Sequence, residues 1–215
     1  MSAREEVVAA AKSFSSAGLT VATWGNISLR VGDSVYITPS GMDYASLLPE
    51  DITEVSAADG RVLSGARRPS TETALHLAVY AARDDVNAIV HTHAAESTAF
   101  AVTGRTVPVI TDEAAQLLGG EVRTAEYALP GTRELAENCV AALGADSMAC
   151  LLRAHGAVCL GPDLKKALAC ALVLEQTCEV YRLALSMGGP AEPFPPERVE
   201  SMKRFLQNSY GQKQS

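Results

Sequence analysis

Two short β-rich runs joined by a two-residue turn determine the kind of sheet that this chain can form. Residues 26–31 and 34–38 have the composition of strands, and only Gly32-Asp33 separates them. A loop of this kind joins antiparallel strands, because a parallel connection needs a crossover of a dozen or more residues. Residues 148–153 and 157–160 form a second closely spaced pair of predicted strands. The sequence therefore predicts a mixed α and β fold around a mostly antiparallel sheet.

The other elements follow from apolar periodicity and from turn residues at the ends of each run. Further strands are expected on both sides of Asp59-Gly60 and at residues 87–93, 107–110 and 122–126. Helices are expected at residues 7–14, from a Ser70 cap to about 83, after Ala94, and at 112–118, 132–143, 163–187 and about 197–207. Because no linker separates these elements, the sequence predicts a single domain over residues 1–215, with 197–215 as a C-terminal helix and tail.

Composition excludes several classes of protein. Hydrophobic residues make up 47% of the 215-residue chain and charged residues 20%, as in an ordinary globular protein. The longest apolar run, residues 167–174, is far shorter than the ~20 residues of a membrane-spanning helix. The net charge is −7 and basic residues occur at most as doublets, so nucleic acid is not an expected partner. The N-terminus lacks the pattern of a secretion signal, which predicts a cytoplasmic protein without membrane attachment.

Three of the four histidines follow predicted strands. His91 and His93 lie at the exit of the apolar run 88–90, and residues two apart on a strand project from one face about 6 to 7 Å apart. Both imidazoles could then bind one ion at Zn–N distances of about 2.0 to 2.1 Å. His155 also follows a strand and precedes Gly156. A lone histidine is more often a core residue, but the His-x-His pair shifts the interpretation toward a metal site.

Glu72 is the natural fourth member of this group. It lies in the first turn of a predicted helix, where the helix dipole favours a carboxylate. Such a glutamate can also do no more than stabilise the helix, by a few tenths of a kcal/mol to ~1 kcal/mol. Spacing alone leaves both interpretations open. His76 lies four residues further along the same helical face, and we interpret it as a hydrogen-bonding or packing residue rather than as a ligand.

Three segments have the composition of anion-binding loops. Residues 23–26 and 38–42 each combine a glycine with hydroxyl or amide donors, and Ser70-Thr71 precedes a helix. Each segment alone is typical of an ordinary turn. Together they predict a phosphate site beside a metal.

Taken in order, these motifs resemble the class II aldolase/adducin family. The matching segments are residues 23–28, 37–42, 68–72, 91–93 and 155–156. The resemblance extends from about residue 5 to residue 210, and it is closest to the zinc-dependent sugar-phosphate aldolases of the L-fuculose-phosphate aldolase type. It implies a three-layer α/β/α domain with a central antiparallel sheet, assembled as a homotetramer with active sites between subunits.

The resemblance also implies roles for individual residues and a reaction in carbohydrate metabolism. His91, His93 and His155 would bind Zn²⁺, or another divalent ion such as Mn²⁺ or Co²⁺, with Glu72 as fourth ligand and proton-transfer group. The residues that match phosphate-binding positions are Gly25, Asn26, Ser40, Gly41, Ser70 and Thr71. A ketose 1-phosphate would be cleaved to dihydroxyacetone phosphate and an aldehyde through an enediolate, which a metal ion stabilises as a Lewis acid.

One departure from the family affects the second proton-transfer group. Family aldolases commonly have a tyrosine in the segment that matches residues 110–114, whereas this chain reads Ile-Thr-Asp-Glu-Ala there. Tyr210, which precedes Gly211 after the last predicted helix, is then the expected catalytic phenol, with Asp112 as the alternative. The competing functions are an L-ribulose-5-phosphate 4-epimerase-like enzyme, a decarboxylase or dehydratase of sugar acids or thiosugars, and a non-enzymatic adducin-like scaffold. The joint presence of three histidines and Glu72 favours an enzyme over the scaffold.

Overall fold

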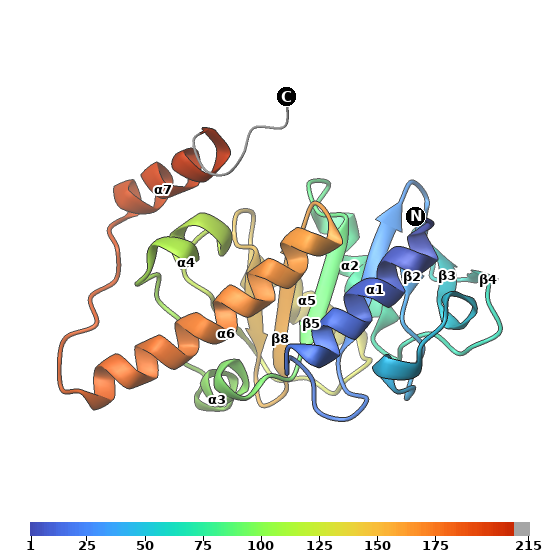
Figure 1. Cartoon of the computed structure of the whole chain (residues 1–215), viewed down its shortest axis with the longest axis horizontal. Helices are drawn as coiled ribbons and strands as arrows, with labels where there is room; N and C mark the ends of the chain where they lie inside the picture. The colour runs from blue at the N-terminus through green and yellow to red at the C-terminus, as the bar shows by residue number, and fades with distance from the viewer. Residues whose placement is uncertain (209–215) are drawn as a thin grey trace.

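A computed structural model describes residues 1–208, and within that range one eight-stranded sheet forms the centre of the molecule in the order β4-β3-β2-β1-β5-β8-β7-β6 (Figure 1). The strands are β1 (Asn26–Val31), β2 (Ser34–Ile37), β3 (Thr53–Ser56), β4 (Val62–Ser64), β5 (Ala88–Thr92), β6 (Thr124–Ala125), β7 (Ala149–Leu152) and β8 (Gly156–Gly161). Neighbouring strands run antiparallel except for the parallel pair β6 and β7. The predicted sheet type is confirmed.

Helices cover both faces of this sheet, which confirms the predicted α/β/α layers (Figure 1). One face carries α1 (Ala3–Ser16), α3 (Ala95–Thr103), α4 (Asp112–Leu117) and α6 (Leu164–Ser186), and the other carries α2 (Thr73–Ala82) and α5 (Arg133–Leu143). The helix α7 (Pro196–Asn208) packs against α4, and two 3-10 turns, η1 (Tyr44–Ser46) and η2 (Pro49–Asp51), follow β2. No helix within residues 1–208 has the length and hydropathy to cross a bilayer.

Three details of the predicted elements are wrong. Residues 107–110 do not form a strand; Val107 makes only an isolated bridge to Val122, because Pro108 has no N–H for a ladder and Thr111 already caps α4. The strand expected at 122–126 is accordingly reduced to β6. The helix expected from Ser70 begins at Thr73, so Glu72 occupies the N-cap position rather than the first turn.

The register of three central strands brings the candidate residues to one edge of the sheet. Asn26 at the start of β1 pairs with His91 near the end of β5, and Ala157 at the start of β8 pairs with Thr92. His155 lies in the turn between β7 and β8. Residues that are remote in sequence therefore meet where β5 ends.

Candidate metal centre

Three imidazoles converge at this edge of the sheet. The ring centroids of His91, His93 and His155 lie 4.8 to 4.9 Å apart in every pair. One nitrogen from each ring lies within 4.8 Å of the others, as ligands of a single ion require. The three histidines predicted from sequence are therefore brought together.

The backbone selects the tautomer of His91. Its Nδ1 lies 2.9 Å from the carbonyl oxygen of Ala157, and a carbonyl only accepts, so Nδ1 carries the proton. The lone pair of Nε2 then points to the centre of the cluster, where it lies 3.1 Å from Nε2 of His93. A hydrogen bond that fixes the second ring nitrogen is typical of metal-binding histidines.

Glu72 lies beside two of these histidines. Its Oε2 lies 3.1 Å from Nε2 of His91 and its Oε1 lies 3.6 Å from Nε2 of His155. Asn26 donates from Nδ2 to the same Oε2 at 2.9 Å. The Glu72 side chain is mostly buried and reaches the histidines from the start of α2.

The protonation states in this cluster follow from burial and from charge. Burial by itself raises the pKa of Glu72, but the charges of His91 and His155 and the hydrogen bonds from His91 and Asn26 outweigh it and hold that pKa below its usual value. Burial, with the charges of His91 and His155, lowers the pKa of His93 to about 3. Burial and the charge of His91 lower the pKa of His155 to about 4. His93 and His155 are therefore neutral near pH 7, as metal ligands must be.

The chemistry of these donors fits a divalent ion. Burial lowers the pKa of His91, but the Glu72 charge outweighs it and raises that pKa, so a second proton on Nε2 can donate to the carboxylate. In the neutral ring the same Nε2 has only a lone pair, which faces the Glu72 carboxylate and Nε2 of His93. Buried atoms without a hydrogen-bond partner include Oε1 of Glu72 and Nδ1 of His155. Three imidazole nitrogens and one carboxylate oxygen are a donor set that Zn²⁺ and neighbouring transition metals accept.

A cavity of about 380 Å³ opens beside this cluster. It is lined by Thr23, Trp24, Gly25, Asn26, Pro39, Ser40, Gly41, Ser70, Thr71, Glu72, His93, Pro130 and His155. All of the residues predicted to bind phosphate are among these, whereas His91 is buried behind the cavity wall. The structure therefore places the phosphate-binding candidates and the metal-binding candidates around one space.

Backbone pairing holds two of the predicted loops side by side. The Ser40 N–H donates to the carbonyl of Arg68 at 3.0 Å, and the Ser70 N–H donates to the carbonyl of Thr38 at 3.1 Å. The Ser70 hydroxyl accepts from the N–H of Glu72, which leaves its own hydrogen free to donate. The pairing thus places hydroxyl donors next to Glu72.

Two glycines at the cavity have different reasons to be glycine. Gly25 has φ +84°, and a Cβ there would lie 2.6 Å from the carbonyl oxygen of His91, so its small size serves packing within the protein. Gly41 has φ +71°, and a Cβ there would meet nothing within 4 Å. Gly41 therefore leaves open space at the cavity, which fits the expected approach of a ligand to the backbone.

Two predicted catalytic residues are not placed at the cavity, and one cavity residue was not predicted from the sequence. Tyr210 lies outside the described residues. Asp112 begins α4, away from the cavity lining, and pairs with Arg198 at 3.3 Å. Pro130 lines the cavity from the loop after β6, and no motif in the sequence pointed to it. Trp24 is 62% exposed, and its ring stacks on His93 with centroids 6.5 Å apart.

Comparison with known proteins agrees with this geometry. Residues 5–182 match the family model described as the Class II Aldolase and Adducin N-terminal domain. The chain is 38% identical over 198 residues to the 5-methylthioribulose-1-phosphate/5-deoxyribulose-1-phosphate aldolase of Rhodospirillum rubrum, covering 92% of this chain and 87% of that protein. It is 36% identical over 211 residues to the 5-deoxy-D-ribulose 1-phosphate aldolase of Bacillus thuringiensis, covering 97% of both. The solved structure of an L-fuculose 1-phosphate aldolase superposes with a TM-score of 0.89 at 33% identity, covering 95% of this chain and 96% of that one.

Proposed function

The chain belongs to the class II aldolase and adducin family, and from this premise we propose that it is a metal-dependent aldolase that cleaves a ketose 1-phosphate to dihydroxyacetone phosphate and an aldehyde. The observation that carries the proposal is the convergence of three histidines and Glu72, with buried polar atoms left unpaired, beside a cavity lined by hydroxyl donors. A scaffold has no use for such a group, because unpaired buried polar atoms destabilise a fold.

His91, His93, His155 and Glu72 would hold the metal, which we propose is zinc, with Mn²⁺ or Co²⁺ as alternatives. The bound ion supplies Lewis-acid stabilisation of the negative charge that develops when the C3–C4 bond breaks. Ser40, Gly41, Ser70 and Thr71 would bind the phosphate through hydroxyl and backbone N–H groups, together with Gly25. Asn26 would use the second hydrogen of its amide, since the first is donated to Glu72.

The cleavage requires two proton movements. The oxygen on C4 loses its proton as it becomes the aldehyde carbonyl, and C3 gains one as the enediolate becomes dihydroxyacetone phosphate. We assign the transfer at C3 to Glu72, which lines the cavity. We assign the exchange at the C4 oxygen to the phenol of Tyr210, with Asp112 as the alternative.

The names of the relatives suggest which aldehydes to test. Cleavage of 5-deoxyribulose 1-phosphate releases acetaldehyde, its methylthio analogue releases a thioether aldehyde, and L-fuculose 1-phosphate releases lactaldehyde. We propose that a short aldehyde of this group is the product. The three ketose 1-phosphates should be incubated with the metal-loaded protein while release of dihydroxyacetone phosphate is followed with a coupled reductase. Release from at least one supports the proposal.

Two results would redirect it. Failure of all three substrates to release dihydroxyacetone phosphate would reject the aldolase reaction. Conversion of L-ribulose 5-phosphate without such release would favour the epimerase alternative instead.

We also propose that the chain forms a single domain over residues 1–215, that it acts in the cytoplasm, and that it assembles as a homotetramer with sites between subunits. Exposed apolar side chains on α6, among them Leu172, Val180, Leu183 and Leu185, support association. Light scattering of the metal-loaded protein tests the assembly, and a monomer at micromolar concentration would contradict it.

A further inference from the structure

A buried chain of polar side chains runs from Glu72 into the layer of α2, away from the cavity. Asn26 bonds Glu72 through Nδ2 and contacts Nε2 of His76 through Oδ1. Nδ1 of His76 lies 2.6 Å from the hydroxyl of Ser28, which lies 2.7 Å from the hydroxyl of Tyr80. His76, Ser28 and Tyr80 do not line the cavity, and His76 and Ser28 are fully buried.

The carboxylate at one end fixes the direction of every bond. Glu72 only accepts, so Asn26 must present its NH₂ group, and its Oδ1 must then face His76. His76 therefore donates from Nε2, which leaves Nδ1 to accept from the Ser28 hydroxyl. Any flip of the amide or of the imidazole tautomer would place two acceptors against each other in a buried site. The buried side chains thus have one arrangement in which every member is satisfied.

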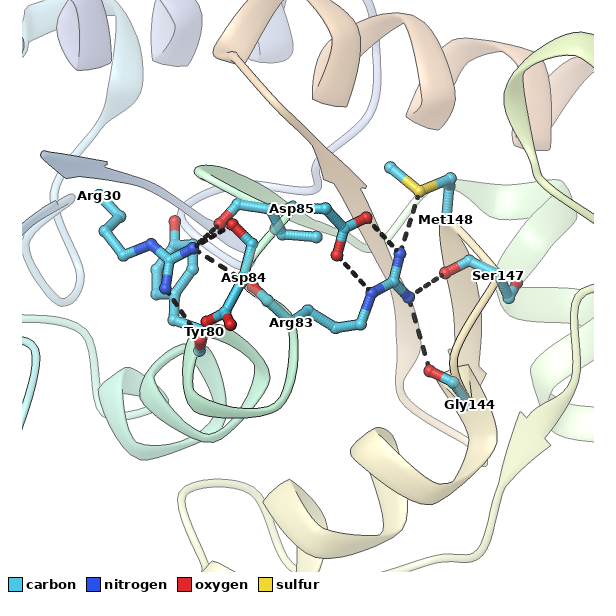
Figure 2. Close-up of polar contacts among 9 residues, drawn as sticks. Arg30, Tyr80, Arg83, Asp84, Asp85, Gly144, Ser147 and Met148 are labelled. Carbon is cyan, nitrogen blue, oxygen red and sulfur yellow. Dashed lines mark hydrogen bonds and ion pairs between the residues drawn. The ribbon is translucent and has the colours of Figure 1, made fainter. Parts of the chain in front are cut away.

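Tyr80, at the far end of this row of side chains, is held by contacts with other residues of the protein. Arg30 donates from Nη1 to the carbonyl of Tyr80 at 2.8 Å, and its guanidinium lies 5.0 Å from the centroid of the Tyr80 ring (Figure 2). The Tyr80 hydroxyl donates its one hydrogen to Ser28, and the carbonyl of Asn87 lies 3.3 Å from the same phenol oxygen. The phenol at the far end is therefore held in place from two sides.

We propose that His76 is a positioning residue for proton transfer at Glu72: it locks the Asn26 amide so that the NH₂ group faces the carboxylate. This inference rests on the proposed function, because it concerns how Glu72 is oriented for that reaction. Without the donor at position 76, Oδ1 of Asn26 is a buried acceptor without its partner, and the amide loses the contact that holds it in place beside Glu72. The hydrogen bond that Asn26 donates to Glu72 is then weakened or lost.

The test compares two substitutions of His76. His76→Leu removes both nitrogens at similar volume, and His76→Gln keeps a donor and an acceptor on one side chain. We expect His76→Leu to lower kcat by about 10- to 100-fold while KM and bound metal change by less than about threefold. His76→Gln should recover most of that loss. A Leu variant with the kcat of the unmodified protein, or a Gln variant no better than Leu, would overturn the inference.

A matched control separates positioning from general loosening of α2. Val79 is fully buried on the same helix and belongs to the apolar cluster under it. Val79→Ala should lower the melting temperature without lowering kcat at a temperature where the variant is folded. Equal losses of kcat in Val79→Ala and His76→Leu would show that His76 affects turnover only through the packing of α2, which would overturn the inference.

A second measurement needs neither catalysis nor a variant. ¹⁵N-histidine NMR of the metal-free and the metal-loaded protein reports which nitrogen of His76 carries the proton. The inference requires a neutral ring with the proton on Nε2, and a proton on Nδ1 would overturn it. If no ketose 1-phosphate is cleaved, the proposed function fails, and the tautomer alone then decides whether the hydrogen bonds run in the direction that the Glu72 carboxylate dictates.

Discussion

The two ends of strand β1 carry buried or half-buried polar groups of opposite character. At Asn26, where β1 begins, the neighbouring histidines and Glu72 include atoms without partners and acceptors that face acceptors. At Arg30, toward the other end, the guanidinium donates to several backbone carbonyls around the end of α2 (Figure 2). Arg83 lies beyond it and bonds Asp85 through two nitrogens. One end is incompletely satisfied and the other is saturated.

This difference separates a ligand site from a structural clamp. A buried polar group that finds its partners within the chain contributes to stability, whereas one that lacks them destabilises the fold until something binds. The carbonyls around Arg30 and Arg83 include groups at the end of α2 and at the turn before β7, so the two arginines tie that helix to the sheet. The unpaired atoms at the opposite end have no such internal role.

Removal of a histidine at the incomplete end has the largest expected effect. His93→Ala should weaken binding of the divalent ion by more than about 100-fold, the upper range for changes outside the direct ligands, and abolish turnover. The fold should persist, because the N–H of residue 93 still donates to the carbonyl of Leu19. Metal analysis after dialysis, together with circular dichroism, checks both parts. Metal content near that of the unmodified protein would remove His93 from the site.

Glu72→Gln has the next largest effect on activity. The amide keeps the size of the side chain but cannot exchange the proton, so turnover should fall by about 10² to 10⁴ with metal largely retained. The matched control is Glu96→Gln, a glutamate in the first turn of α3 that pairs with Arg182 at 2.7 Å, and it should leave turnover unchanged. Equal turnover in Glu72→Gln and in the unmodified protein would reduce Glu72 to a residue at the start of a helix.

The incomplete end could be predicted from sequence in part. His91 and His93 could be placed together because alternation along a strand is local, and His155 because it follows a strand. The bonds from Asn26 to Glu72 and to His76 span 46 and 50 residues, and they depend on how α2 packs on the sheet. No periodicity encodes such pairs, so the direction of the buried hydrogen bonds became visible only in three dimensions.

The saturated end was invisible in the sequence for a related reason. Arg30 and Arg83 resemble ordinary surface arginines until the turn before β7 and the end of α2 are placed around them. The strand expected at 107–110 failed at the sheet edge, where β propensity is not supported by a neighbouring strand and Pro108 interrupts the ladder. Local pattern thus predicted the central strands better than the contacts at their ends.

The saturated end should respond to mutation in stability rather than in activity. Arg83→Met removes the bonds to Asp85 and to the carbonyls of Gly144 and Ser147, and we expect a loss of about 2 to 3 kcal/mol in the free energy of unfolding. Metal content and kcat should stay unchanged. Arg133→Met is the control, because Arg133 forms an exposed pair with Glu137, and its loss should cost less than about 0.5 kcal/mol. Urea unfolding measures the free energies of both variants. A loss of bound metal in Arg83→Met would show that the contacts of Arg83 also support the metal site.

The smallest effect concerns backbone strain beside His155. Ala154 has φ +54°, a left-handed conformation that disfavours a residue with a Cβ by roughly 1 to 2 kcal/mol. Ala154→Gly removes that strain but adds about 0.4 to 1 kcal/mol of chain entropy to the unfolded state, so the net gain in stability is between about 0 and 1.6 kcal/mol. The residue is exposed and its N–H donates to the carbonyl of Ala101, which glycine preserves.

Metal content should not change in Ala154→Gly, because the residue after His155 sets the position of the turn. A Cβ at Gly156 would lie 2.2 Å from the carbonyl oxygen of Thr92, so the glycine allows β8 to lie close against β5. Urea unfolding of the metal-free protein isolates the backbone term. A gain in stability without a change in metal affinity would mean that the side chains alone determine metal binding at the incomplete end. A drop in metal affinity would mean that the strained turn helps to orient His155.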